Sequence, residues 1–344
     1  MLEPTSPTRA TIEDVAAAAN VSVATVSRAL RGLPNVADST RLRVQEVARE
    51  MHYRADPAAS RLAAGRAGAL GVVVPFVNSW YCAEVMAGVE AVCAEAGHDT
   101  IVISLGTDNG ERRRIDGSRA MHRRVDGLVI VDIAISDDEV AAIRQSGLPM
   151  VSIGPVLAGC ASLGVDDVEV GRVATRHLIS LGHRRLGLIG DRTDSVFWFV
   201  VPQLRQRGFE AACRAAGIEV APELVAEGSF TVQGGADAFE QLMSLDDPPT
   251  AIFAIGDDMA FGALQRAREL GLDVPGDVSI IGVDDQPVAD VLGLTTVHQD
   301  VAEHGAHAAR LIVEQLAGNE PAIDRFDAPI TLVERDTTAP PRPR

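Results

Sequence analysis

From residue 69 onward, short apolar runs alternate with longer stretches whose apolar positions recur at helical spacing. The runs are rich in Val, Ile and Leu, which is typical of strands buried on both faces of a parallel sheet. Similar strand–helix series begin at Leu70 and at Leu186, so we expect two Rossmann-like lobes rather than one long sheet. The predicted strands are Leu70–Val74, Thr100–Ile103, Gly127–Val131, Pro149–Ile153, Leu186–Ile189, Ala251–Ile255 and Val278–Val283, and the helices include Glu84–Ala96, Val168–Leu181, Gln203–Ala216, Met259–Leu270 and Val301–Ala317.

The preceding residues, 11–56, have a different pattern, which predicts three short helices. A capping box of the form TIED begins at Thr11, and Asn20 suits a left-handed residue at the end of that helix. Ser22 is expected to cap the second helix, and Asp38 or Ser39 the third. The inward positions are Ile12, Val15, Ala16, Ala19, Val26, Ala29, Leu30, Val44, Val47, Ala48 and Met51.

Three short helices with a tight turn between the first two are typical of a helix-turn-helix domain, whose second helix enters the DNA major groove. The alternative is a three-helix domain that binds protein. Exposed Val23 and Ala24 beside Arg28 favour the DNA-binding interpretation. Small apolar side chains can contact thymine methyl groups, and Arg can donate two hydrogen bonds to guanine.

Length and charge agree with this division. The chain has 344 residues, which is too long for one compact core. Its net charge of −17 argues by itself against a polyanion such as DNA. However, residues 1–66 hold nine Arg against seven acids, and the remaining 278 residues hold 22 Arg against 41 acids. The acidity therefore belongs to the body of the chain, and all 31 basic residues are Arg.

Other patterns exclude several classes of protein. The polar, Pro-rich start predicts no signal peptide, and no apolar run is long enough to span a membrane, so we expect a cytoplasmic protein. The four Cys are far apart, and the eight His lack metal-ligand spacing; His304 and His307 are expected on a solvated helix face. Motifs of hydrolases and nucleotide-binding loops are missing, so neither an enzyme nor a cofactor or metal site is predicted.

The head carries a specific resemblance. The runs TIEDVAAAANVSVATVSRAL and NVADSTRLRVQEVAREMHYRADP resemble the DNA-binding head of the LacI family of bacterial transcription regulators. Body segments such as RVDGLVIV, GLPMVSIG and HLISLGHRRLGLIGD also follow in family order, so the resemblance covers nearly the whole chain. It implies base-reading positions at Val23, Ala24 and Arg28, and phosphate contacts at Thr11, Ser22, Thr25, Ser27, Arg31, Asn35 and Thr40.

Between head and body, residues 57–67 read PAASRLAAGRA. From composition this is a short helix of marginal stability or an ordinary flexible linker. The resemblance implies a hinge helix that pairs with its twin from a second subunit in the minor groove. Leu62 would then be the wedge between bases, with Ala59 and Arg61 contacting the groove and backbone.

The resemblance also implies the domain organisation. We expect disordered tails at residues 1–10 and 337–344, a helix-turn-helix domain at 11–56, the hinge helix at 57–67, and an effector-binding and dimerisation domain at 68–336 similar to periplasmic sugar-binding proteins. Its first lobe spans about 68–168 and 300–327, and its second about 169–297 and 328–336.

Candidate effector-binding residues follow from the rule that ligands bind at the carboxyl ends of strands in open α/β sheets. Family positions fall on Tyr81, Asp166, Arg205, Asp284 and Gln299, and Trp80 is a further candidate from its place after the first strand. This set is typical of a sugar or polyol site. Asp166 and Asp284 have an alternative role as caps, and Arg205 as a surface ion pair.

Two departures from the family leave the effector open. Gly256 stands where the family often has Asn, and Phe197, Trp198 and Phe199 stand where it often has small polar residues. These aromatic residues either pack in the core or narrow the cleft.

The family pattern predicts a repressor that binds a near-palindromic operator as a homodimer and sits on the nucleoid when bound. The dimer face is expected near Tyr81–Ala96, where Val85, Val89 and Val92 could equally be core. Effector binding would change the lobe angle and hence the hinge helices, either releasing or promoting DNA binding. The alternative function is a cytosolic sugar-binding protein without a DNA role.

Overall fold

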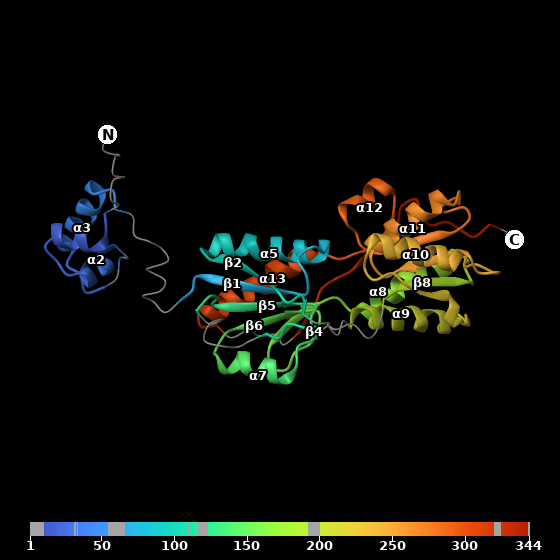
Figure 1. Ribbon diagram of the computed structural model, residues 1–344, viewed down its shortest axis with the longest axis horizontal. Coiled ribbons are helices and arrows are strands. Elements are labelled where there is room, and N and C mark those ends of the chain that lie inside the picture. Colours follow the sequence, from blue (N-terminus) through green and yellow to red (C-terminus); the bar gives the residue numbers. More distant parts are fainter. Residues whose placement is uncertain are drawn as a thin grey trace. The chain divides into compact units, whose positions relative to one another are not determined.

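A computed structural model of the chain describes residues 10–30, 32, 34–53, 66–108, 111–115, 123–191, 200–319 and 325–342. The chain divides into two compact units, a head of residues Met1–Gly68 and a body of residues Ala69–Arg344. Figure 1 shows the elements of each unit. The head is all α-helical and the body contains mostly parallel sheets, which confirms the predicted fold class.

The head consists of α1 (Ile12–Ala18), α2 (Val23–Leu30) and α3 (Asp38–Glu50) around a small apolar core. Thr11 caps α1 in a capping box with Asp14, and Ser22 Oγ accepts from Thr25 N at 3.1 Å at the start of α2, as predicted. Asn20 has φ +52°, as the turn between the two helices requires. The residues buried here are Val15, Ala16, Ala19, Val26, Ala29, Val44 and Ala48, all predicted to face inward.

The predicted cap of α3 is wrong. The N-cap is Ala37, which makes no side-chain cap hydrogen bond, and Asp38 is already the first helical residue. Its carboxylate lies in the first turn, where it favours the helix through the macrodipole rather than through capping.

Lobe 1 of the body is built on a six-stranded parallel sheet. Its order is β13 (Arg325–Asp327), β7 (Ala161–Gly164), β6 (Met150–Ile153), β5 (Gly127–Val131), β1 (Ala69–Val74) and β2 (Asp99–Ser104). Figure 1 shows one face of the sheet covered by α5 (Trp80–Ala96) and α13 (Val301–Leu316) and the other by α7 (Asp137–Gln145). The strands β3 (Thr107–Asp108) and β4 (Glu111–Arg112) pair antiparallel in a separate two-stranded sheet.

Lobe 2 has a second six-stranded sheet, which is parallel except for its antiparallel edge strand β14. The order is β14 (Thr331–Val333), β12 (Thr295–His298), β11 (Ser279–Asp284), β10 (Ala251–Ala254), β8 (Leu186–Gly190) and β9 (Val225–Glu227). The helices around it are α8 (Asp167–Ser180), α9 (Val201–Ala215), α10 (Val232–Met243), α11 (Asp257–Glu269), the 3₁₀ turn η1 (Pro222–Leu224) and α12 (Pro287–Leu292). In Figure 1, α8 and α9 lie on one side of this lobe and α10 and α11 on the other.

The chain passes between the lobes three times, from β7 to α8, from β12 to α13 and from β13 to β14. Strands that are far apart in sequence therefore share one sheet. Because nearly all strands are parallel, their carboxyl ends lie at one edge of each sheet.

Helices α5 and α13 pack very closely in lobe 1. A Cβ on Gly88 would lie 1.8 Å from the carbonyl oxygen of Ala302, and one on Gly305 would lie 2.0 Å from that of Val85. Val85 and Val89 are fully buried in this contact, and Val92 packs against the same core. The core alternative is therefore correct for Val85 and Val89, which are not available as a dimer face, whereas Val92 is half-buried.

The expectation that residues 337–344 form a disordered tail is wrong for residues 337–342. Thr337 is buried, its carbonyl oxygen accepts from Ile280 N at 2.8 Å, and its hydroxyl donates to Ile280 O at 2.7 Å. Ala339 N donates to Ser279 Oγ at 3.1 Å. The segment supplies partners for buried polar groups of lobe 2 that would otherwise have none, and this offsets the entropy of ordering a Pro-rich stretch.

We expect deletion of residues 337–344 to lower the free energy of unfolding of the body by about 3 kcal/mol, because it leaves several buried hydrogen-bonding groups without partners. Thermal or urea unfolding of the full chain measures this loss. Deletion of residues 343–344 alone is the matched control and should change little. Equal stability of the two truncated chains would contradict a structural role for the segment.

Candidate functional site

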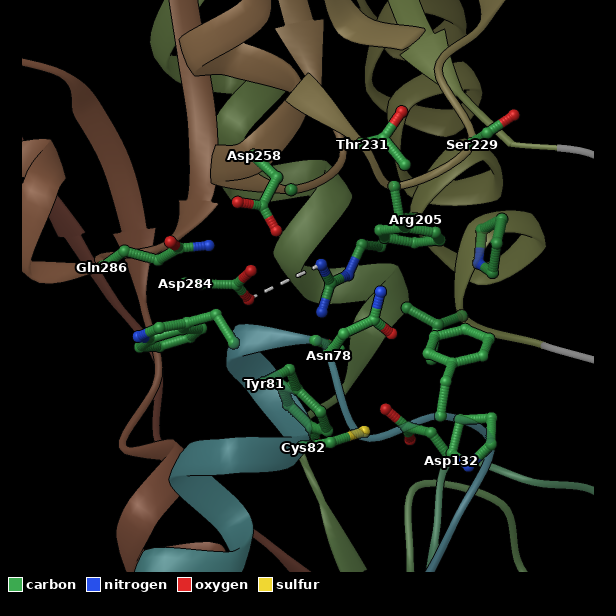
Figure 2. Close-up of a pocket in the computed structure, with 18 residues that line it drawn as sticks. Asn78, Tyr81, Cys82, Asp132, Arg205, Ser229, Thr231, Asp258, Asp284 and Gln286 are labelled. Carbon is green, nitrogen blue, oxygen red and sulfur yellow. Dashed lines mark ion pairs between the residues drawn. The ribbon is translucent and has the colours of Figure 1, made fainter. Parts of the chain in front are cut away.

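A cavity of about 410 Å³ lies between the two lobes of the body (Figure 2). That volume suits a small organic ligand. Lobe 1 contributes Pro75, Phe76, Asn78, Ser79, Trp80, Tyr81, Cys82 and Asp132. Lobe 2 contributes Val201, Pro202, Arg205, Ser229, Phe230, Thr231, Gly256, Asp258, Asp284 and Gln286.

The lining is built largely at the carboxyl ends of the parallel strands. Phe76 follows β1, and Asp132 comes directly after β5. In lobe 2, Phe230 follows β9, Asp258 follows β10 and Asp284 ends β11. This is the place where open α/β sheets expose their loops to ligands, so the topology itself positions the cavity.

Arg205 of α9 is the buried cation of the site, with 5% of its surface exposed. Its Nε donates to Oδ1 of Asp167 at 2.8 Å, and its Nη1 donates to the carbonyl oxygen of Ile255 at 2.6 Å. Nη1 also lies 4.0 Å from Oδ1 of Asp284, the ion pair dashed in Figure 2. Burial opposes the charge, but the carboxylates of Asp167 and Asp284 outweigh it and raise the pKa of Arg205.

Asp284 is held in an unusual conformation at the end of β11. Its φ of +116° lies in a region that L-residues rarely adopt, and such strain is concentrated at functional sites. Gln299, which is buried, donates from Nε2 to Asp284 Oδ1 at 2.6 Å. Burial raises the pKa of Asp284 to about 6, although Arg205 and the hydrogen bond from Gln299 oppose the rise.

Asp132 is a second carboxyl group with a raised pKa. Burial is the largest cause and the charge of Asp167 adds to it, so the pKa of Asp132 rises to about 7, although Arg205 and a hydrogen bond from Tyr81 oppose the rise. Burial and the nearby Asp132 also raise the pKa of Tyr81 well above its ordinary value, so its hydroxyl keeps its proton. The Tyr81 hydroxyl therefore donates to Asp132, and the remaining oxygen lone pairs of the two groups can accept hydrogen bonds at the cavity.

Asp257 stands behind the lining and supports it. Its Oδ1 accepts from Thr296 Oγ1 at 2.7 Å, and its Oδ2 accepts from the backbone nitrogen of Gln286 at 2.9 Å. Burial raises the pKa of Asp257 well above the ordinary value. The next residue, Asp258, lines the cavity, and burial raises its pKa too.

Four of the six predicted effector-binding residues, Trp80, Tyr81, Arg205 and Asp284, line this cavity. Gln299 lies behind it and acts on the lining through its hydrogen bond to Asp284. Contact of these residues with an effector stays a prediction.

Asp166 does not belong to this cavity lining. It is exposed, and its Oδ1 accepts from Val168 N at 3.0 Å and Glu169 N at 3.1 Å. The alternative role given to it, a cap of the following helix, is the one the structure shows. Its neighbour Asp167 instead turns inward to Arg205.

Several lining residues were not predicted from the sequence: Phe76, Asn78, Asp132, Ser229, Phe230, Thr231, Asp258 and Gln286. The strand-end rule would have found Asp132 and Asp258, because each follows a predicted strand by a few residues at most. Ser229 and Phe230 follow β9, a strand that the sequence pattern did not predict, and both have positive φ.

Gly256 lies in the lining beside Phe230. A Cβ at this position would contact the Phe230 ring at 3.4 Å, so the aromatic side chain lies close to the position at which the resemblance implies an Asn. The departure from the family therefore makes this wall more apolar. The second departure, Phe197, Trp198 and Phe199, lies outside the described residues.

In the head, the three predicted base-reading residues lie on the exposed surface of α2. Val23 is 40% exposed, and Ala24 and Arg28 are exposed as well. Of the predicted phosphate contacts, Thr11, Ser22 and Asn35 are exposed and Thr25, Ser27 and Thr40 half-buried. The remaining predicted contacts lie outside the described residues: Arg31 and the hinge residues Ala59, Arg61 and Leu62.

Within the described ranges, no group of three or more His, Cys, Asp and Glu residues could hold a metal ion. No helix in these ranges is long and apolar enough to cross a membrane. The expectation for His304 is wrong: it is 2% exposed, because α13 packs closely on α5. His307 is half-buried and stacks on Phe326 with ring centroids 4.7 Å apart.

Comparison with known proteins gives matches over most of the chain. The profile of bacterial regulatory proteins of the lacI family matches residues 11–56, and that of periplasmic binding protein-like domains matches residues 175–338. The HTH-type transcriptional repressor CytR of Escherichia coli strain K12 is 32% identical over 317 residues, covering 90% of this chain and 91% of CytR.

Two solved structures are similar over 96% of this chain and 100% of theirs. The transcriptional regulator CelR in complex with cellobiose is 29% identical, with a TM-score of 0.68. The lac repressor dimer bound to operator and an anti-inducer is 24% identical with a TM-score of 0.83, which shows the same fold.

The raised pKa values of the cavity carboxyl groups make a prediction about stability. Asp132 has a higher pKa in the folded protein than in the unfolded chain, so folding takes up a proton and stability falls as the pH rises. We expect Asp132→Asn to raise the free energy of unfolding at about pH 8 by on the order of 2 kcal/mol, and to have no such effect near about pH 4.

Urea unfolding across this pH range measures the effect. Asp246→Asn, at an exposed position of lobe 2 outside the cavity, is the control and should follow the original protein at every pH. An Asp132→Asn protein that is less stable than the original at high pH would show that the carboxylate is well compensated where it lies.

Proposed function

This chain belongs to the lacI family of bacterial regulatory proteins and is a DNA-binding transcriptional regulator rather than an enzyme, and we propose that it is a repressor whose α2 reads an operator and whose interlobe cavity binds the effector. The observation that carries the effector role is the cavity itself. Groups from both lobes, among them Asp132 of lobe 1 and Arg205 and Asp284 of lobe 2, converge on a space of small-molecule size.

The head supports direct reading of DNA. Val23, Ala24 and Arg28 are exposed on the helix that follows the tight turn, while the opposite positions Val26 and Ala29 are buried in the core. These buried residues hold α2 against the other helices of the head. The predicted base-reading side chains therefore face the solvent. Arg28 then donates two hydrogen bonds to a guanine, and Val23 and Ala24 meet thymine methyl groups.

The cavity supports control by conformational change. A ligand that contacts Tyr81 and Asp132 from lobe 1 and Arg205 and Asp284 from lobe 2 favours the lobe angle at which all contacts are made. Only three chain segments join the lobes, so this angle is the natural degree of freedom. Residues 57–67, which connect the head to β1, carry the change to the DNA-binding unit as a hinge helix that forms or melts.

The finer features belong to the same proposal. The protein acts as a homodimer on a near-palindromic operator, because one head reads only a half-site. The effector is a sugar or a sugar-like compound, in keeping with the cellobiose bound to the related CelR. Binding to chromosomal DNA places the protein in the bacterial cytoplasm, on the nucleoid when the operator is occupied.

We expect Arg28→Ala to weaken operator binding by about 1–3 kcal/mol and to relax the preference at one base pair of each half-site. Selection of binding sites from random DNA measures this preference. Arg49→Ala is the matched control, because Arg49 is exposed on α3 and pairs with Glu46. An unchanged preference in the Arg28 variant would remove its assigned role.

We expect effector binding to change operator affinity by about 5–150-fold, and Asp284→Asn to reduce this change strongly. Asn tolerates the positive φ of this position, so the substitution tests the charge rather than the backbone. A thermal-shift screen of sugars, sugar phosphates, polyols and nucleobases identifies the ligand, because a ligand that binds the folded state raises its stability.

Operator affinity with and without that ligand is then measured for the original protein, Asp284→Asn and the control Asp246→Asn. The direction of the change tells an inducer from a corepressor. A ligand that binds the body and leaves operator affinity unchanged would contradict the proposed control.

A further inference from the structure

We propose that the effector carries a positive charge, as a protonated amine, and that Asp132, Asp258 and Asp284 hold it inside the interlobe cavity. This rests on the proposed function of the cavity as the effector site, and it names the chemical class of the ligand.

The first argument is the balance of charges around the cavity. Three carboxyl groups line it, whereas Arg205 is the one cationic side chain among the described lining residues. Arg205 is already engaged by Asp167, which lies behind the lining and makes the shorter contact, 2.8 Å against 4.0 Å to Asp284. One guanidinium is therefore shared between Asp167 and the cavity lining, and the three lining carboxyl groups are left in excess.

Among the described residues, the arginines near these carboxyl groups already pair with other carboxylates. Arg335 pairs with Asp285 at 2.7 Å and with Asp290 at 3.4 Å, and Arg325 pairs with Asp327 at 2.7 Å. Asp257 adds a further carboxyl group close to Asp284, and its partners Thr296 and Gln286 are neutral. A positively charged ligand would balance the negative charge that the protein leaves uncompensated at the cavity.

The protonation behaviour of the carboxyl groups agrees with this balance. Burial and mutual repulsion raise the pKa of Asp132 to about 7 and that of Asp284 to about 6. Carboxyl groups that met enough positive charge within the protein would have lowered pKa values instead. A phosphate or carboxylate ligand would add to the repulsion, which argues against sugar phosphates and sugar acids.

The remaining lining suits the organic part of such a ligand. Phe76, Trp80 and Phe230 contribute aromatic rings, and Pro75 and Pro202 add apolar surface. Aromatic faces attract ammonium groups as well as apolar surface, and this strengthens when water is excluded. Figure 2 shows Asp258 and Asp284 on the lobe 2 side of the cavity and Asp132 on the lobe 1 side, with Asn78 and Arg205 between them in this view, so carboxyl groups are present on both walls.

The experiment compares ligands that differ only in charge. Isothermal titration and thermal shift on the full chain, without DNA, use pairs in which an amine replaces one hydroxyl: glucosamine and glucose, galactosamine and galactose, and 4-amino-1-butanol and 1,4-butanediol. Glucose 6-phosphate and gluconate are the anionic members of the panel. We expect at least one amine to bind about tenfold or more tightly than its hydroxyl twin, and the anions not to bind.

Two isosteric variants test the assigned residues. Asp258→Asn and Asp132→Asn should each weaken the amine by about tenfold or more and reduce its advantage over the hydroxyl twin, because each removes one charge from its surroundings. Asp246→Asn, which changes an exposed carboxylate of the same lobe, should keep the advantage. A thermal melt of each variant without ligand confirms that it is folded.

The proposal is overturned if no amine of the panel binds, if a hydroxyl twin or an anion binds as tightly, or if both cavity variants keep the preference for the amine. Because binding is measured without DNA, this outcome is separate from the fate of the proposed function. An uncharged ligand that shifts operator affinity would leave the regulator intact and remove only the charge of its effector. An amine that binds and leaves operator affinity unchanged would support the charge assigned to the ligand and contradict the proposed control of DNA binding.

Discussion

The buried guanidinium of Arg205 is the interaction on which the interlobe cavity depends. One side chain of α9 connects the start of α8 through Asp167, the end of β10 through the carbonyl oxygen of Ile255, and the end of β11 through Asp284. Removing one member of such a buried pair leaves an uncompensated charge, which typically costs 3–5 kcal/mol. Arg205 therefore holds the ends of the lobe 2 elements in one arrangement, and that arrangement shapes half of the cavity.

The same interaction explains the electrostatic character of the site. Arg205 compensates the charge of Asp167 most directly. The carboxyl groups that face the cavity therefore receive weaker electrostatic compensation from it. Their raised pKa values are the consequence of burial without sufficient positive charge. Under the proposal above, a cationic ligand would reduce the repulsion between these carboxyl groups. Because they come from both lobes, such binding would couple ligand recognition to the lobe angle.

Much of the fold followed from the sequence, because it depends on local patterns. The predicted strands at Leu70, Gly127 and Leu186 appear within one residue of their expected starts, since continuous Val, Ile and Leu runs have few alternatives to a buried parallel strand. The caps at Thr11 and Ser22 appeared as predicted because capping involves residues only three apart. The cap of α3 failed because Asp38 also suits the first turn of a helix. The last residues were misjudged because a polar, Pro-rich composition is typical of disorder, whereas here hydrogen bonds to Ser279 and Ile280 of lobe 2 hold the segment in place.

The sequence by itself determined the family, the two kinds of unit and the strand ends at which the site residues collect. It identified Arg205 and Asp284 because they fall on positions that the resemblance marks, but it chose Asp166 where Asp167 turns inward. Two adjacent carboxylates are equivalent in a sequence, and only the orientation of the first turn of α8 decides which one faces Arg205. Likewise, the strand-end rule places Asp132 at the edge of the lobe 1 sheet, but only the placement of lobe 1 opposite lobe 2, across three chain crossings, sets it in a cavity with the carboxyl groups of lobe 2. Local patterns specify elements because their causes lie within a few residues, whereas burial, charge balance and the cavity arise from contacts between segments far apart in the chain.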